Sequence, residues 1–181
     1  MPVFLSGKVI HKKTDYALSF SDCHPDVQPV YESASHTAVG QQLSQMSDDY
    51  TGTLALLASA EVKRNGGSSV DAQAQLFMWL AAGITSLRRL RSCRRTGVYA
   101  QKRLPLVGWT VIGHVWEVYI AFERDEVTGA VQITGPIEGA GGDTRSVEGV
   151  FKLLNMVSVI KKYGKETYWP WLKADCLDAI V

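Results

Sequence analysis

Residues 54–80, LALLASAEVKRNGGSSVDAQAQLFMWL, decide the fold of this chain of 181 residues. The first ten, Leu54–Lys63, are small or apolar until Glu61, which predicts a strand that is buried along most of its length. The next five, Arg64–Ser68, include two glycines and an asparagine and predict an abrupt turn. The strand is therefore expected to end in polar residues at an edge of the core.

A long helix is predicted directly after this turn. Ser68 with Asp71 three residues later resembles a capping box, which is typical of helix starts. Apolar side chains then recur at helical spacing to about Arg91, so the helix has one face for the core. Gln73 and Gln75 lie in its first turns and can lean back toward the end of the preceding strand.

Two charged residues close the predicted strand. Glu61 and Lys63 are two residues apart, so in a strand their side chains point to the same face. Another predicted strand, residues 15–20, opens with Asp15. Pairing of the two strands would bring two carboxylates and a lysine together. Such a set predicts a site for a hard divalent cation, with an amine beside it that can orient water.

Each of these residues also has a simpler explanation. Glu61 and Lys63 could form only a salt bridge at a strand end, which contributes little to stability. Asp15 could serve only in the turn before its strand, and Gln75 could be an ordinary polar residue at a helix edge. The residues alone leave both interpretations open.

The remaining elements are predicted from periodicity and turn residues, within a single domain of residues 1–181. Further strands are expected at residues 3–10, at 104–122 in two segments broken near Gly108 or Gly113, and at 130–134. A short helix is expected at 35–45, and a longer one from Asp143 or Thr144 to Tyr163, ended by Gly164. Five residues of the longer helix are expected to face inward: Val147, Val150, Phe151, Leu154 and Val157. The aromatic segment 168–172 is expected to pack on the domain.

Composition argues against several classes of protein. Apolar residues make up 46% of the chain and charged residues 20%, a balance typical of globular proteins. The sequence shows neither an apolar run long enough to span a membrane nor the pattern of a signal peptide. An intracellular protein, nuclear or cytoplasmic, is therefore expected. The three cysteines and four histidines are scattered, which fits neither a disulfide framework nor a zinc site.

Positive charge is concentrated in one part of the chain, although the net charge is only +1. Residues 72–116 contain no Asp or Glu. The candidate nucleic-acid contacts in this segment are Arg88, Arg89, Arg91, Arg94 and Arg95. Such a patch can hold phosphates. A solvated helix end, where cations suit the helix C-terminus, explains the same residues.

The order of these residues resembles the PD-(D/E)XK nuclease superfamily. Asp15, the triplet Glu61-Val62-Lys63 and a following helix with Gln75 are similar to the metal-binding and lysine elements of that superfamily, and residues 75–79 are similar to the QxxxY element of its RecB-like branch. More specifically, residues 13–172 resemble the fungal PD-(D/E)XK nuclease-like proteins. The segments that carry this likeness are Asp71–Ala82, Leu104-Pro105, Gly113–Trp116, Thr144–Ser146 and Tyr168–Trp171.

The resemblance implies a fold and an activity. The fold would be α/β, of the α+β type, with a mixed central sheet flanked by helices and a restriction-endonuclease-like core. The core is expected to lack the helix that usually precedes the first strand. The activity would be cleavage of phosphodiester bonds of nucleic acid, dependent on Mg²⁺ or Mn²⁺. Asp15, Glu61 and the carbonyl of Val62 would bind the metal, Lys63 would orient the attacking water, and Gln75 would hold Lys63 or a phosphate.

Two other functions stay open. The same fold could bind nucleic acid or a protein without cleaving it, or could serve small-molecule chemistry as a biosynthetic enzyme. The resemblance also raises a homodimer as an expectation, because many such nucleases pair to cut two strands. DNA and RNA substrates are not distinguished, since no base-reading motif is evident.

Overall fold

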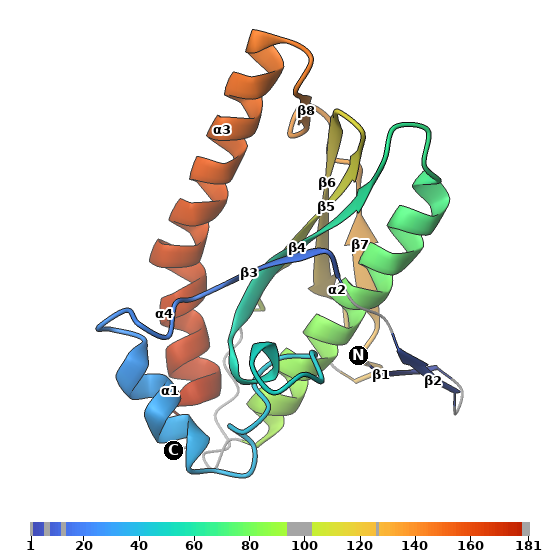
Figure 1. Cartoon of the computed structure of the whole chain (residues 1–181). Helices are drawn as coiled ribbons and strands as arrows, with labels where there is room; N and C mark the ends of the chain where they lie inside the picture. The colour runs from blue at the N-terminus through green and yellow to red at the C-terminus, as the bar shows by residue number, and fades with distance from the viewer. Residues whose placement is uncertain (1, 6–7, 12–13, 94–102, 126, 179–181) are drawn as a thin grey trace.

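Figure 1 shows the computed structural model of the chain, which describes residues 2–5, 8–11, 14–93, 103–125 and 127–178. A hairpin of β1 (Pro2–Leu5) and β2 (Lys8–His11) precedes the main sheet, at the segment where one strand over 3–10 was expected. The main sheet contains β3 (Tyr16–Ser19), β4 (Leu56–Lys63), β5 (Leu106–Ile112), β6 (Val115–Glu123), β7 (Val131–Thr134) and β8 (Gly142–Asp143).

This main sheet is mixed. Its strand order is β3-β4-β5-β6-β7, with β8 paired to β6. β4 and β5 run parallel, whereas the other neighbouring strands are antiparallel. β5 and β6 form a hairpin that turns at Gly113, whose φ of +57° suits glycine and strains other residues. The α+β class and the mixed sheet are confirmed.

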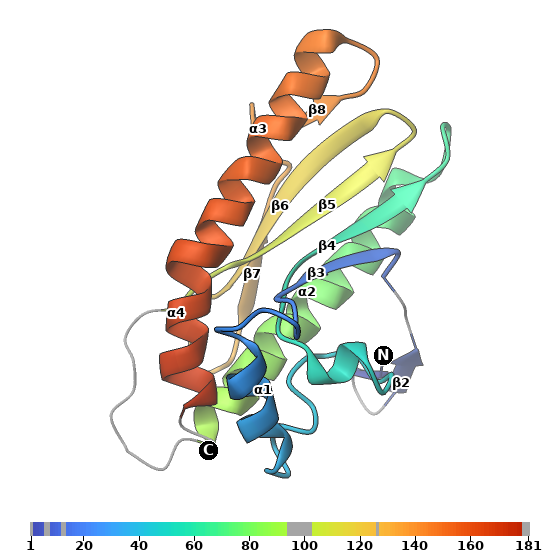
Figure 2. The same cartoon turned by 60° about the vertical axis from the view of Figure 1, so that its left-hand side comes forward.

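Helices flank the sheet on both faces (Figures 1 and 2). They are α1 (Gln28–Ser35), the 3₁₀-helix η1 (Thr51–Thr53), α2 (Ser69–Ser92), α3 (Val147–Tyr163) and α4 (Trp169–Leu172), with π-helical segments η2 (Gly164–Tyr168) and η3 (Lys173–Leu177) around α4. None of the described helices combines the length and apolar character that crossing a membrane would require.

α2 covers one face of the sheet and begins where the sequence predicted. The Ser68 hydroxyl accepts a hydrogen bond from the backbone N–H of Asp71 at 3.1 Å, which caps the first turn. Leu76 and Leu80 are fully buried beneath it, against β5. A Cβ at Gly108 of β5 would lie 2.6 Å from Leu76 Cδ1, so the strand can approach the helix closely only because this residue has no side chain.

α3 lies on the other face, and the prediction of its inward side was wrong. Its buried residues are Gly149, Leu153, Met156 and Ile160, and Trp109 Nε1 of β5 contacts Met156 Sδ at 3.0 Å. The residues expected inward are exposed instead: Val147, Val150, Phe151, Leu154 and Val157. The cause is that α3 carries apolar residues on two sides, so helical periodicity alone could not select the packed side. Its N-cap is Ser146 rather than Asp143 or Thr144.

Two helix boundaries also differ from the sequence predictions. The helix expected at 35–45 is wrong: α1 occupies Gln28–Ser35, with Pro29 in its first turn, where proline is tolerated. Gly164 does not end α3, because its φ of −57° is helical and the chain continues through η2. A Cβ at Gly164 would lie 2.8 Å from Leu57 Cδ2, so this glycine allows close packing.

The aromatic segment after Gly164 packs on the domain, as expected. Tyr168, Leu172 and Leu177 are fully buried. The Tyr168 hydroxyl donates a hydrogen bond to the carbonyl oxygen of Leu56, the first residue of β4, at 3.3 Å. The C-terminal helical segments therefore complete the core beneath the start of β4.

Candidate functional site

Asp15 and Glu61 lie just beyond the last residue pair of two neighbouring strands. Tyr16 of β3 pairs with Ala60 of β4 in an antiparallel register; Asp15 immediately precedes Tyr16, and Glu61 immediately follows Ala60. Asp15 Oδ2 accepts a hydrogen bond from the backbone N–H of Val62 at 2.7 Å. This bond fixes one oxygen of the Asp15 carboxylate. Because Asp15 is exposed, its other oxygen can bind a ligand.

Glu61 and Lys63 form an ion pair on the α2 side of the sheet. Glu61 is 1% exposed, and its Oε2 lies 3.8 Å from Lys63 Nζ. The Lys63 side chain is 25% exposed, so the ammonium group lies at the boundary between the core and solvent. A buried carboxylate is costly unless a counter-charge offsets its desolvation. Lys63 supplies that counter-charge.

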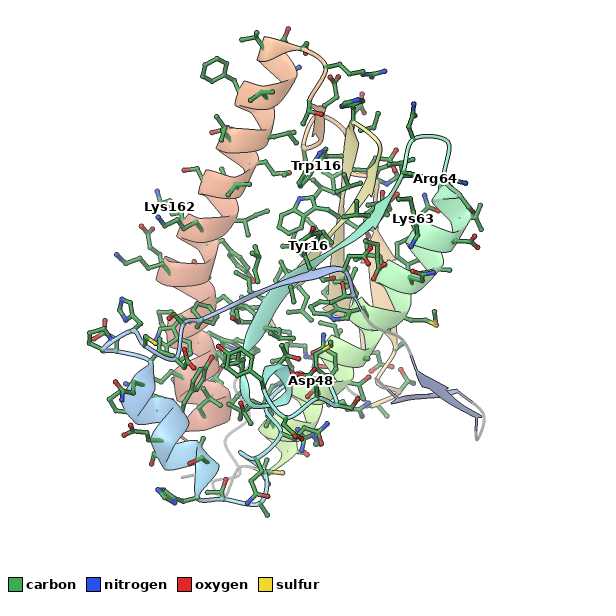
Figure 3. The ribbon with its side chains drawn as sticks, in the orientation of Figure 1. Tyr16, Asp48, Lys63, Arg64, Trp116 and Lys162 are labelled. Atoms are coloured by element: carbon green, nitrogen blue, oxygen red, sulfur yellow. The ribbon has the colours of Figure 1, made fainter. Side chains whose placement is uncertain are left out.

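Gln75 holds the lysine from α2. Lys63 Nζ donates a hydrogen bond to Gln75 Oε1 at 2.9 Å. The contact is possible because the turn of residues 64–68 directs α2 back past the end of β4, and Gln75 lies in the second turn of that helix. Figure 3 shows Lys63 beside this part of α2, with Tyr16 marking the nearby start of β3. The Lys63 ammonium is therefore oriented by two side chains.

A second polar group extends the site across the sheet. Glu61, Thr110 and Glu117 are neighbours in register on β4, β5 and β6, so all three point to the α2 side. Glu117 Oε2 accepts hydrogen bonds from Thr110 Oγ1 at 3.2 Å and from the Tyr119 hydroxyl at 3.0 Å. Gln73 Nε2 of α2 in turn donates to the Tyr119 hydroxyl at 2.9 Å.

This second group makes Tyr119 a hydrogen-bond donor. Burial, together with its hydrogen bond to Glu117, raises the pKa of Tyr119 and keeps the phenol protonated. Sequence reasoning singled out Gln73 but missed Glu117 and Tyr119. Their spacing of two along a strand places them on one face, but only the strand register shows that this face adjoins Glu61.

The predicted nucleic-acid contacts lie elsewhere on α2. Arg88 follows Gln75 by thirteen residues, which is about 20 Å along a helix. Arg88, Arg91 and Arg103 surround the buried Glu123 carboxylate, with N–O distances of 3.6, 3.1 and 3.5 Å. Arg89 donates to the carbonyl oxygen of Gln42. Arg94 and Arg95 lie outside the described residues.

The oxygen atoms near Asp15 are of the chemical type that binds hard divalent cations. Mg²⁺ and Mn²⁺ take carboxylate and backbone carbonyl oxygens, which Asp15, Glu61 and Val62 carry. Mg²⁺ usually keeps several waters, so few protein ligands suffice. In the part of the chain that the structure describes, no group of three or more His, Cys, Asp or Glu residues could hold a metal ion.

Comparison with protein-family models gave a match over most of the chain. A family model described as the PD-(D/E)XK nuclease superfamily matches residues 2–169. The matched segment includes Asp15, Glu61, Lys63 and Gln75, as well as the second polar group. No curated protein and no solved structure gave a significant match.

Proposed function

The chain belongs to the PD-(D/E)XK nuclease superfamily, and we propose that it is a divalent-metal-dependent nuclease that hydrolyses phosphodiester bonds of nucleic acid. The observation that carries this proposal is that Asp15, which directly precedes β3, Glu61 and Lys63 of β4, and Gln75 of α2 lie at one end of the sheet. Members of the superfamily generally use divalent metal ions. The motif segments further support a place in its fungal nuclease-like group.

Each residue of the site has a role in this proposal. Asp15, Glu61 and the Val62 carbonyl would hold Mg²⁺ or Mn²⁺, which when bound would polarise the phosphodiester and make a bound water more acidic. Asp15 is held for this role by the Val62 N–H. Lys63, oriented by Gln75, would donate a hydrogen bond to the attacking water or to a non-bridging phosphate oxygen. Its positive charge would offset the negative charge that develops there.

Contacts to the nucleic acid are proposed for the arginines at the end of α2. Arg88 and Arg91 of α2, together with Arg103, lie around the buried Glu123 carboxylate, so several cationic side chains gather at this end of α2. Cationic side chains attract the phosphate backbone over a Debye length of about 10 Å. Arg89, Arg94 and Arg95 stay predicted contacts.

One observation favours a second candidate function, binding without cleavage. Glu61 is 1% exposed and paired with Lys63, so its carboxylate is directed toward the ammonium group rather than toward solvent. A ligand at this carboxylate would have to enter beside Lys63. If the Glu61 carboxylate stays paired and binds no metal ion, the protein would not cleave. It would then be a module of the same fold that binds nucleic acid or a protein.

The deciding experiment is cleavage of labelled single-stranded DNA, duplex DNA and RNA with Mg²⁺, Mn²⁺ or EDTA. Asp15→Asn and Glu61→Gln are the test variants, because each removes a charge and keeps the shape of the side chain. In Asp15→Asn, the oxygen of the new amide can still accept the hydrogen bond from the Val62 N–H. Asp49→Asn, at an exposed acid outside the site, is the matched control.

We expect metal-dependent cleavage that both test variants reduce by about 100-fold or more and the control leaves unchanged. If Asp15→Asn cleaves as fast as the parent, the assignment of the site is wrong. Retention of a labelled substrate by the parent without cleavage in any metal would favour the second candidate.

A further inference from the structure

The first two turns of α2 carry two glutamines that bond to different strands of the sheet. Leu76 is fully buried and points toward the sheet. Gln73 and Gln75 lie to either side of Leu76, about 60° and 100° away around the helix axis. Gln75 accepts a hydrogen bond from Lys63 of β4 at 2.9 Å. Gln73 donates to Tyr119 of β6 at 2.9 Å. Because β5 lies between β4 and β6, the start of α2 has one polar contact on each side of β5.

The contact with β6 depends on the Tyr119 hydroxyl. This hydroxyl accepts the hydrogen bond from Gln73 and donates its own proton to Glu117 Oε2 at 3.0 Å. A phenol has a single proton to donate, so the hydroxyl joins the two side chains as acceptor for one and donor for the other. Tyr119 is 1% exposed, so little water reaches it. Thr110 of β5 donates to the same Glu117 oxygen at 3.2 Å, which fixes the carboxylate beneath α2.

Apolar packing and these polar contacts restrain different movements of α2. Leu76 and Leu80 are fully buried and lie against Gly108 of β5, which sets the distance between helix and strand. Apolar attraction has no preferred direction, so by itself it restrains rotation of the helix about its axis weakly. Hydrogen bonds are directional, and two of them on opposite sides of the helix oppose rotation in either direction.

Rotation of α2 would separate Gln75 from Lys63. A side-chain oxygen about 6 Å from the helix axis moves about 1 Å when the helix turns by roughly 10°. Added to 2.9 Å, that movement breaks the hydrogen bond between Lys63 Nζ and Gln75 Oε1. The ammonium group of a lysine sits on a flexible stem, so its direction depends on its partners. A misplacement of about 1 Å in a reacting group can cost on the order of 100-fold in rate.

We propose that Gln73, Tyr119 and Glu117 are positioning residues for the candidate site. They fix the rotation of α2 so that Gln75 orients the Lys63 ammonium. This inference rests on the proposed nuclease function, in which Lys63 acts on the attacking water or on the phosphate. The three positioning residues act through α2 and touch neither the substrate nor the metal ion.

The first test is the kinetics of Tyr119→Phe on the nucleic acid that the parent cleaves best. We expect kcat to fall by about tenfold or more while KM changes by less than about twofold, because the substrate contacts remain. Tyr163→Phe is the matched control. The Tyr163 hydroxyl also bonds within the protein, to the carbonyl oxygen of Pro105 at 2.9 Å, but it does so on the α3 side of the sheet. The control should keep the kcat of the parent.

A double variant tests whether the effect passes through Gln75. In a Gln75→Ala background, Tyr119→Phe should lower kcat no further, because the group that it positions is absent. Gln73→Ala removes the same contact from the helix side and should match Tyr119→Phe. Glu117→Gln keeps an acceptor for the Tyr119 hydroxyl and should retain kcat within about threefold. Urea unfolding shows whether each variant is folded.

A second readout needs no cleavage. Acetic anhydride modifies lysines, and mass spectrometry of the peptides gives the rate at each one, here with EDTA and without substrate. Release from Gln75 should speed the modification of Lys63 by about threefold in Tyr119→Phe and not in Tyr163→Phe. Lys152, an exposed lysine of α3, is the internal reference.

The outcomes separate this inference from the proposed function. A Tyr119→Phe variant with the kcat and the Lys63 modification rate of the parent overturns the inference, and so does an equal loss in the Gln75→Ala background. A loss in Glu117→Gln as large as in Asp15→Asn also overturns it, because Glu117 would then bind the metal ion. If the parent cleaves no nucleic acid, the proposed function fails, and the modification rate of Lys63 decides the inference.

Discussion

Lys63→Met should destabilise the protein, whereas Glu61→Gln should not. Methionine keeps the apolar stem of the lysine and removes the ammonium group that lies 3.8 Å from the Glu61 carboxylate. Loss of one partner of a buried ion pair costs about 3–5 kcal/mol, because the carboxylate stays buried after this counter-charge is removed. Lys63 is a quarter exposed, so water offsets part of this cost, and we expect a loss of about 2–3 kcal/mol.

Glu61→Gln removes the other charge of the same pair. The amide needs no counter-charge, and Lys63 still donates to Gln75 at 2.9 Å and still reaches solvent. Replacement of a buried charge that leaves no uncompensated partner is often neutral or stabilising. We therefore expect a free energy of unfolding within about 1 kcal/mol of the parent, or above it.

The assay is equilibrium unfolding in urea with EDTA present, followed by tryptophan fluorescence and circular dichroism. Together with the two single variants, the double variant Lys63→Met, Glu61→Gln completes a thermodynamic cycle. It should be more stable than Lys63→Met alone, because the buried carboxylate that lost the Lys63 ammonium is itself replaced by a neutral amide. The reasoning is refuted if Lys63→Met is as stable as the parent, or if Glu61→Gln loses as much stability as Lys63→Met.

Three further variants test contacts elsewhere in the domain. Tyr31→Phe should lower the free energy of unfolding at pH 7 by about 1–2 kcal/mol, because the Tyr31 hydroxyl accepts a hydrogen bond from the backbone N–H of Ala55 at 2.9 Å. Burial raises the pKa of Tyr31 to about 12, so the stability it contributes is complete below pH 10 and is lost as pH rises toward 12. Between pH 10 and pH 12 the melting temperature of the variant should fall less steeply with pH than that of the parent. Equal slopes for the two proteins would contradict this. Glu123→Gln should cost about 2–3 kcal/mol in urea unfolding, because one buried carboxylate pairs with three arginines. A variant as stable as the parent would show that the cluster contributes nothing. Gly113→Ala should cost about 1–2 kcal/mol in the same assay, because φ is +57° and the new Cβ would lie 3.1 Å from Asn65. A Gly113→Ala variant as stable as the parent would show that the turn between β5 and β6 adjusts to the added Cβ.

The strand and helix around the site could be predicted from sequence because local signals agreed there. Small apolar residues to Ala60, two glycines in the turn and the Ser68 cap all point to a strand, a turn and a helix. The sequence analysis only supposed that Asp15 comes from a strand next to β4; its contact with the Val62 N–H is known from the structure.

The parts that sequence reasoning missed depend on three-dimensional packing. On α3, apolar residues lie on two sides, and only contact with the sheet selects Leu153 and Met156 over Phe151 and Leu154. Gly164 was predicted to end α3, but its role is in packing: the chain passes so close to Leu57 that a Cβ at this position would clash. Glu117 lies beside Thr110 only because of the register between β5 and β6. Sequence periodicity within one strand does not give this register.

The bond between Tyr168 and Leu56 has a consequence for how the protein is made. The two residues are 112 positions apart, and the buried side chains of Leu172 and Leu177 follow Tyr168 in the chain. While a ribosome is still adding the residues after β7, the start of β4 lacks the groups that cover it. Contacts this distant in sequence slow folding. We therefore expect the core to be completed only after residue 177 has left the ribosome. Until then, chaperones can bind the exposed start of β4.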